Sequence, residues 1–339
     1  MSILRRGIVL LGALLLIVGC TTTLQSPPTW IDSLYDQSYD EKSYICAVGA
    51  GSTRDNAVNA AFAALSQTFN TQVESILTYS GFSSAETQGA GETIFYDSQA
   101  LLEQSQLSSK SGTIIGGEVV NSYVDANQTV WVRVAIHRQK TAQLYSKEMD
   151  ELARQIATIK LSSATSPSPL RSYFCLLEAL PLAVEHLQMA QQIALLTGES
   201  KKSYLSELNT QLDHLASNVT LALEVSVIVP AAEEVATHKE LTGAFRALFN
   251  DFGFNLKEKD AKGIPIVKIG YSIRDDETNQ GPYSHAYYTL SVAIVDGDET
   301  IGSYQKSQRE SAMTPKDART RALRSALNQG VEGFKEALR

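Results

Sequence analysis

The feature that most constrains the fold is a strict alternation of apolar and other residues in the C-terminal third of the chain. From 219 to 229 every second residue is valine or leucine, and Pro230 follows. A second run, His285–Val295, alternates in the same way. A repeat of two residues is the period of a β-strand with one buried and one solvated face. We therefore expect a sheet with one face in the core and the other in water.

The same region carries the remaining patterns of an α+β domain, 219–339. Helices are predicted at Thr237–Phe252 and Pro315–Leu338 from the spacing of their apolar residues. Three further strands are predicted at Phe254–Lys257, Ile264–Ile273 and Ile301–Arg309. The last of these is polar on both faces, which is typical of a strand at a protected sheet edge.

A second set of patterns predicts a smaller domain at 29–161. A short apolar strand, Tyr44–Val48, ends at glycine and precedes a helix with alanines along one stripe. Two alternating segments, Glu118–Val124 and Thr129–His137, flank a polar turn and predict an antiparallel hairpin. Residues 81–117 are rich in serine, glutamine and glycine, and their pattern favours neither helix nor strand.

Apolar helices are expected between the two domains. Gln139–Leu161 is helical in pattern and closes the first domain. Leu170–Leu196 follows, with a kink expected at Pro181, and Ser203–Ser217 completes a helical hairpin over 167–217. The predicted fold class is α+β: two small α/β-type domains with antiparallel sheets packed by helices, joined by this hairpin.

The N-terminus has the organisation of a bacterial lipoprotein signal peptide, 1–19. Two arginines precede an apolar run that is much shorter than the roughly 20 residues of a membrane-spanning helix. Ile17-Val18-Gly19-Cys20 resembles the site that a lipoprotein signal peptidase cuts before the cysteine. An ordinary secretory leader with a chance cysteine is the alternative.

Lipidation of Cys20 is the chemical consequence of such a signal. We expect a thioether-linked diacylglycerol and an acyl chain such as palmitate on the new amino group, which together hold a protein firmly on a membrane. Residues 20–28 form a polar, proline-ended tether. Threonine follows Cys20 where aspartate would favour the inner membrane, so we expect a periplasm-facing outer-membrane location.

Charge and cysteine content narrow the function further. The net charge is −8. Cleavage of the signal peptide would remove two arginines, so the mature chain would be more acidic still. Such a surface repels nucleic acid and anionic lipid. Besides Cys20, the chain has Cys46 and Cys175, both in apolar segments. Two free buried thiols are favoured, and a disulfide between them is the alternative in an oxidising compartment.

Motifs for catalysis or for metal and cofactor binding are weak. Gly49-Ala50-Gly51 lacks the third glycine of a dinucleotide fingerprint and the lysine of a P-loop. The acidic clusters Asp275–Glu277 and Asp296–Glu299 lack calcium-loop spacing and lie where turns are expected. Five scattered histidines show no metal-binding spacing. We therefore expect no enzyme activity, no metal and no cofactor. Polar and aromatic residues predicted for an interaction surface are Trp131, Arg133, Tyr283 and Tyr287.

Several short motifs resemble the LPP-twenty family of outer-membrane lipoproteins, which includes flagellar P-type lipoproteins. They are the Cys20 motif, Pro28-x-Trp30, Ala47–Gly51 with the alanine-rich helix after it, and Val130–Val134. The resemblance covers about 28 to 160 and leaves out the second domain. It implies a compact α/β domain on the cell envelope without established catalysis, sometimes built into a disk around the flagellar motor.

These patterns predict a non-catalytic assembly or interaction module of the bacterial envelope. Its partners would be the membrane, through lipidated Cys20, and envelope proteins or a second copy, but not nucleic acid. The first alternative is a binder of a small ligand or glycan at Tyr287 and Trp131, which a deep apolar pocket would favour. The second is a hydrolase, which a close nucleophile–base pair would favour.

Overall fold

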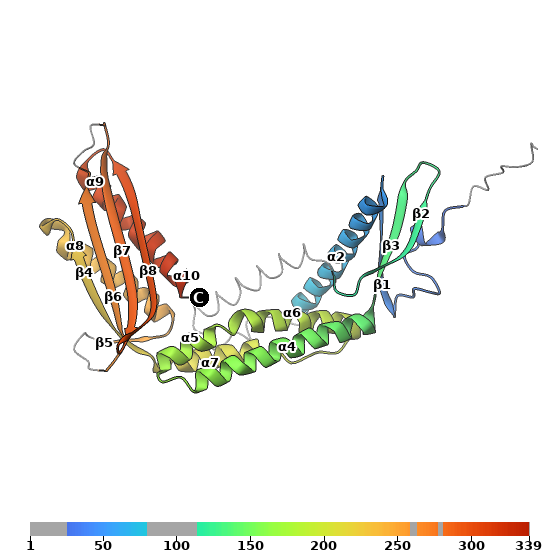
Figure 1. Cartoon of the computed structure of the whole chain (residues 1–339), viewed down its shortest axis with the longest axis horizontal. Helices are drawn as coiled ribbons and strands as arrows, with labels where there is room; N and C mark the ends of the chain where they lie inside the picture. The colour runs from blue at the N-terminus through green and yellow to red at the C-terminus, as the bar shows by residue number, and fades with distance from the viewer. Residues whose placement is uncertain (1–25, 80–113, 258–262, 277–280, 339) are drawn as a thin grey trace, which may run out of the picture. The chain divides into compact units, whose positions relative to one another are not determined.

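The fold class is mixed α/β, with helices packed against one antiparallel and one mixed sheet. The computed structural model describes residues 26–79, 114–257, 263–276 and 281–338 (Figure 1). The chain divides into two compact units: unit 1, Met1–Asn70 with Ser111–Thr141, and unit 2, Thr71–Lys110 with Ala142–Arg339. Within the described ranges, every helix is too short or too polar to span a bilayer. Cys20 and most of 81–117 lie outside these ranges.

Unit 1 has a three-stranded antiparallel sheet in the order β1-β3-β2, with one long helix. Its elements are β1 (Tyr44–Gly51), α2 (Arg54–Tyr79), β2 (Glu118–Val124) and β3 (Val130–His137). The alanine stripe of α2 is buried, with Ala57 and Ala61 fully covered. The predicted hairpin is confirmed by the pairing of β2 with β3. In its turn, the Asp125 carboxylate accepts hydrogen bonds from the amides of Asn127 and Thr129.

Four helices follow the hairpin: α4 (Arg138–Ala164), α5 (Pro169–Leu177), α6 (Leu180–Thr197) and α7 (Leu205–Asn218). The single helix expected at 170–196 is two helices, because Pro181 lies in the first turn of α6. Gly198, with a φ of 75°, ends α6 as predicted.

These helices share one hydrophobic core with the sheet that follows, so 167–217 is part of unit 2 and not a separate hairpin. Tyr173 of α5 contacts Phe252 and Phe254 edge to face, with ring centroids 6.4 and 4.9 Å apart. The unit boundary accordingly falls at Thr141, near the start of α4, where the sequence predicted a domain end at 161.

The second sheet of the structure has five strands in the order β5-β4-β6-β7-β8. Its strands are β4 (Thr220–Ile228), β5 (Asn255–Lys257), β6 (Ile266–Asp275), β7 (Ser284–Asp296) and β8 (Glu299–Ala312). β6, β7 and β8 are antiparallel, as expected. β4 is parallel to both β5 and β6, which differs from the prediction, because α8 (Ala231–Asp251) carries the chain back before β5 begins. β8 lies at the sheet edge, which confirms the prediction for the last strand.

Helices cover one face of this sheet (Figure 1). They are α8, α9 (Pro315–Ser325) and α10 (Val331–Ala337), with a π-helical turn, Ala326–Gly330, between the last two. Phe334 of α10 contacts Phe245 and Phe249 of α8, with centroids 6.0 and 6.2 Å apart. The apolar residues that alternate along β7 point to this side and are buried.

The polar residues of the same strands point to the other side, which we call the open face. The residues that define it are Ser226, Ser272, Tyr287, Thr289, Ser291 and Ser307, all half-buried or exposed. The strand register places them in adjacent rows across β4, β6, β7 and β8. One side of the unit 2 sheet therefore builds the core, and the other presents a polar surface.

Candidate functional site

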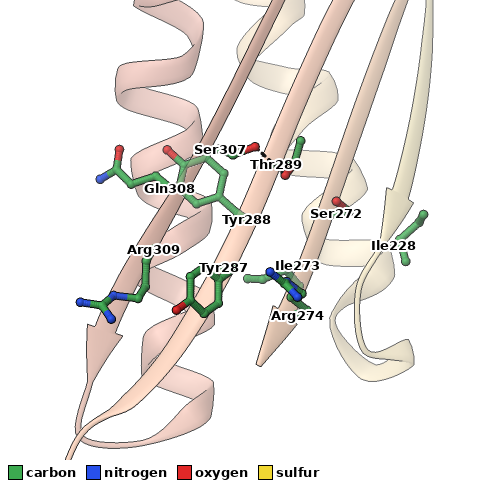
Figure 2. Close-up of a pocket in the computed structure, with 10 residues that line it drawn as sticks. All are labelled: Ile228, Ser272, Ile273, Arg274, Tyr287, Tyr288, Thr289, Ser307, Gln308 and Arg309. Carbon is green, nitrogen blue, oxygen red and sulfur yellow. Dashed lines mark hydrogen bonds between the residues drawn. The ribbon is translucent and has the colours of Figure 1, made fainter. Parts of the chain in front are cut away.

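Two shallow hollows lie on the open face. The larger, of about 540 Å³, has Ile228, Arg274, Tyr287 and Arg309 in its lining (Figure 2). The smaller, of about 400 Å³, has Lys268, Ser291 and Gln305 among its lining residues. Both are open to solvent, and the strand register sets which residues lie next to one another across this surface.

A row of three residues crosses the larger hollow. Arg274 of β6 and Arg309 of β8 both pair in register with Tyr287 of β7. Figure 2 shows the two arginines on opposite sides of Tyr287. The Cζ atom of Arg274 lies 5.1 Å from the centroid of the Tyr287 ring, within cation–π range. We call Arg274, Tyr287 and Arg309 the arginine row.

Strand alternation separates these arginines from the acidic residues next to them in sequence. Asp275 and Glu310 pair in register with Ala286 and lie on the helix-covered side. There Arg319 of α9 binds the Asp275 carboxylate at 2.7 Å, and it also binds Glu233 of α8. These two carboxylates hold the pKa of Arg319 above its ordinary value, mainly because Arg319 donates hydrogen bonds to Glu233.

Glu310 has its own partner as well, because the Gln308 side-chain amide donates to its carboxylate at 2.7 Å. Across the residues that the structure describes, neither Arg274 nor Arg309 forms an ion pair. Their guanidinium groups remain available for a ligand. An arginine that stays protonated and presents planar donors is suited to bind carboxylate or phosphate.

A row of hydroxyl groups lies beside the arginine row. Ser272, Thr289 and Ser307 are aligned in register, and the Thr289 and Ser307 hydroxyls are hydrogen-bonded at 2.8 Å. Ile228 continues this row on β4 and is 74% exposed. Positive charge, an aromatic ring, hydroxyl groups and one apolar side chain thus line one shallow hollow, and this combination of groups is suited to binding.

One serine–histidine pair lies at the same end of the sheet. The Oγ of Ser311 and the Nδ1 of His285 are 2.6 Å apart across β7 and β8. Among the described carboxylates, none lies within ion-pair distance of the imidazole, where the third member of a catalytic triad would be found. Neighbouring strand positions account for the pair as a cross-strand hydrogen bond.

The structure removes Arg133 from the predicted interaction surface. Its side chain is buried in unit 1, where the guanidinium forms an ion pair with Asp36 at 2.8 Å. It also donates to the Asn121 side-chain oxygen and contacts the rings of Trp30 and Tyr39. The segment before β1 therefore covers this face of the unit 1 sheet, which the strand pattern alone did not predict.

The other predicted surface residues lie in different places. Trp131 is half-buried, and its Nε1 donates to the Asp125 carboxylate at 3.2 Å. Tyr283 is 53% exposed just before β7, and Tyr287 is at the centre of the arginine row. Arg274 and Arg309 were missed. The apolar alternation of β6 could have indicated that Arg274 lies on a solvated face, but β8 is polar on both faces and its pattern could not place Arg309.

Both described cysteines are free, so the alternative of a disulfide is not supported. Cys46 is buried in β1, and burial raises the pKa of its thiol to about 11. Cys175 lies in α5 and is half-buried, not fully buried as expected. The two residues belong to different units.

The acidic turns have structural partners. Asp296, the last residue of β7, accepts hydrogen bonds from Ser168 and Arg171 at the start of α5, and Glu299 pairs with Arg171. In the part of the chain that can be described, no group of three or more acidic, histidine or cysteine residues is placed to hold a metal ion.

No protein-family model and no curated protein matches this chain. Solved structures give partial matches. The secreted protein HP1454 from Helicobacter pylori is 12% identical, with a TM-score of 0.43, over 86% of this chain and 96% of that one. A minor lipoprotein from Acinetobacter baumannii (14% identical, TM-score 0.24) matches over 34% of this chain and 89% of its own. Rare lipoprotein B from Shewanella oneidensis is 15% identical, with a TM-score of 0.24, and matches over 35% of this chain and 90% of its own. At these scores the matches do not indicate what this chain binds.

Proposed function

We propose that this protein is a lipid-anchored lipoprotein of the bacterial envelope that acts as a non-catalytic interaction module through the open face of unit 2. The anchor rests on the signal pattern that ends at Cys20. Threonine at the next position favours the outer membrane. A tether of a few residues joins Cys20 to Trp30, which is buried in unit 1.

The main support for a binding role is that the two faces of the unit 2 sheet differ in composition. Its helix-covered side builds the hydrophobic core, while the open face combines tyrosine and arginine with hydroxyl groups. Tyrosine and arginine are enriched among the residues that contribute most to protein interfaces. The hollows are shallow, and small ligands generally prefer enclosed pockets. A macromolecular partner therefore fits this surface better than a small ligand or glycan.

Site-specific photo-crosslinking in living cells tests this role. A photo-reactive amino acid at Ser291, exposed on the open face, is expected to give discrete adducts with envelope components. The same amino acid at Lys239, exposed on α8, is the matched control and is expected to give none. Adducts of equal yield from both positions, or none from Ser291, would show that the open face is not the binding surface.

A further inference from the structure

We propose that the open face binds an extended acidic segment of a partner protein, whose carboxylates pair with Arg274 and Arg309 across Tyr287. This inference rests on the proposed interaction role and adds the chemistry of the partner. It follows from three properties of the arginine row: its positive charge, which no described carboxylate pairs with, its spacing and the hydroxyl groups beside it.

The charge of the row is opposite to that of the chain. The whole sequence has a net charge of −8, yet the described residues that line this hollow include two arginines and no carboxylate. Asp275 and Glu310 are turned to the other side of the sheet, where Arg319 and Gln308 engage them. A negatively charged partner is the complement of this local field, and it would be steered here on an otherwise acidic molecule.

The spacing of the row favours two separate anionic groups over one. β6 and β8 lie on either side of β7, so the Cα atoms of Arg274 and Arg309 are about 10 Å apart. Tyr287 lies between the two side chains (Figure 2). Alternate residues of an extended chain project to one side at intervals of about 7 Å, which two long arginine side chains can reach. An extended chain with two acidic side chains on one face can therefore engage both arginines at once.

The neighbouring row can hold the backbone of such a segment. Ser272, Thr289 and Ser307 run parallel to the arginine row and offer hydroxyl groups that donate or accept hydrogen bonds. The hollow is open to solvent, as an extended chain that crosses it requires. An acidic extended peptide thus satisfies the charges and the hydroxyls together.

A labelled peptide tests the proposal directly. Fluorescein-labelled (Glu-Ser)6 is titrated with the purified, detergent-solubilised protein, and binding is followed by fluorescence polarisation. We expect saturable binding that Arg274→Gln and Arg309→Gln each weaken by about tenfold, the effect of one lost charge-assisted contact. Arg246→Gln on α8 removes the same charge from an exposed site away from the row and is expected to leave the affinity unchanged.

Three outcomes would overturn the proposal. Equal weakening by Arg246→Gln would mean that the peptide responds only to net charge. Equal binding of (Lys-Ser)6 would remove the charge complementarity. Binding to phosphatidylglycerol vesicles without binding to the peptide would assign the row to a lipid surface. Because both arginines are exposed, the variants are expected to keep the wild-type melting curve. If Ser291 gives adducts in cells while the peptide does not bind, the interaction role stands and the acidic partner is ruled out.

Discussion

Gly49→Ala is expected to destabilise unit 1 by about 3 kcal/mol or more, because overpacking against a rigid backbone cannot be relieved by one rotamer change. A Cβ added at Gly49 would lie 2.7 Å from the carbonyl oxygen of Ala57 and from the carbonyl carbon of Ala60. All of α2 would have to move away from β1. Such a loss is a large fraction of the stability of a small domain.

Urea unfolding followed by tryptophan fluorescence measures this effect selectively. The chain has two tryptophans, Trp30 and Trp131, and both lie in unit 1. Asn59→Ala is the matched control, because Asn59 is exposed on α2 in unit 1 and alanine favours a helix over asparagine. A Gly49→Ala protein with an unchanged unfolding midpoint would contradict the close packing of α2 on β1.

Arg133→Met is expected to destabilise unit 1 by about 3 kcal/mol, because it leaves Asp36 and Asn121 without the donor that they share. Methionine keeps an unbranched apolar side chain in the buried space but supplies no hydrogen bond. The same fluorescence measurement reports this change, since Trp30 contacts the Arg133 guanidinium at 5.7 Å. Arg54→Met, at an exposed position that begins α2, should have little effect.

The effect of Arg133→Met should also depend on pH. The hydrogen bond from Arg133 lowers the pKa of Asp36 below its ordinary value of 3.8. The ionised carboxylate therefore stabilises the folded state above that ordinary value, and this contribution is lost as the pH falls through the lowered pKa. The difference in the free energy of unfolding between Arg133→Met and wild type should therefore become smaller as the pH falls. A difference that is constant from neutral pH to acid would show that the ion pair does not stabilise unit 1.

The strands could be predicted from the sequence because their pattern has a physical cause within each segment. The alternation from 219 to 229 and along His285–Val295 reflects one buried face, and both segments form strands. The direction of β4 could not be predicted in this way, since parallel and antiparallel neighbours impose the same alternation. It depends on where α8 returns the chain, which is a tertiary property.

The candidate site was only partly predictable for the same reason. Tyr287 was predicted as an aromatic residue on the solvent-exposed face of a strand. Its neighbours Arg274 and Arg309 are 13 residues before it and 22 after it in sequence, and only the register of three strands brings them together. Arg133 was misplaced because the segment that buries it, with Asp36 and Trp30, has no strand or helix pattern of its own.

The measurement that tests the envelope lipoprotein claim most directly is the fate of Cys20. Cells that express wild type or Cys20→Ser are labelled with an alkyne analogue of palmitate and separated into soluble, inner-membrane and outer-membrane fractions. The wild-type protein should carry the label and collect with the outer membrane, and Cys20→Ser should be unlabelled and absent from that fraction. The lipid anchor would be contradicted if neither protein carried the label and both were found in the same fractions.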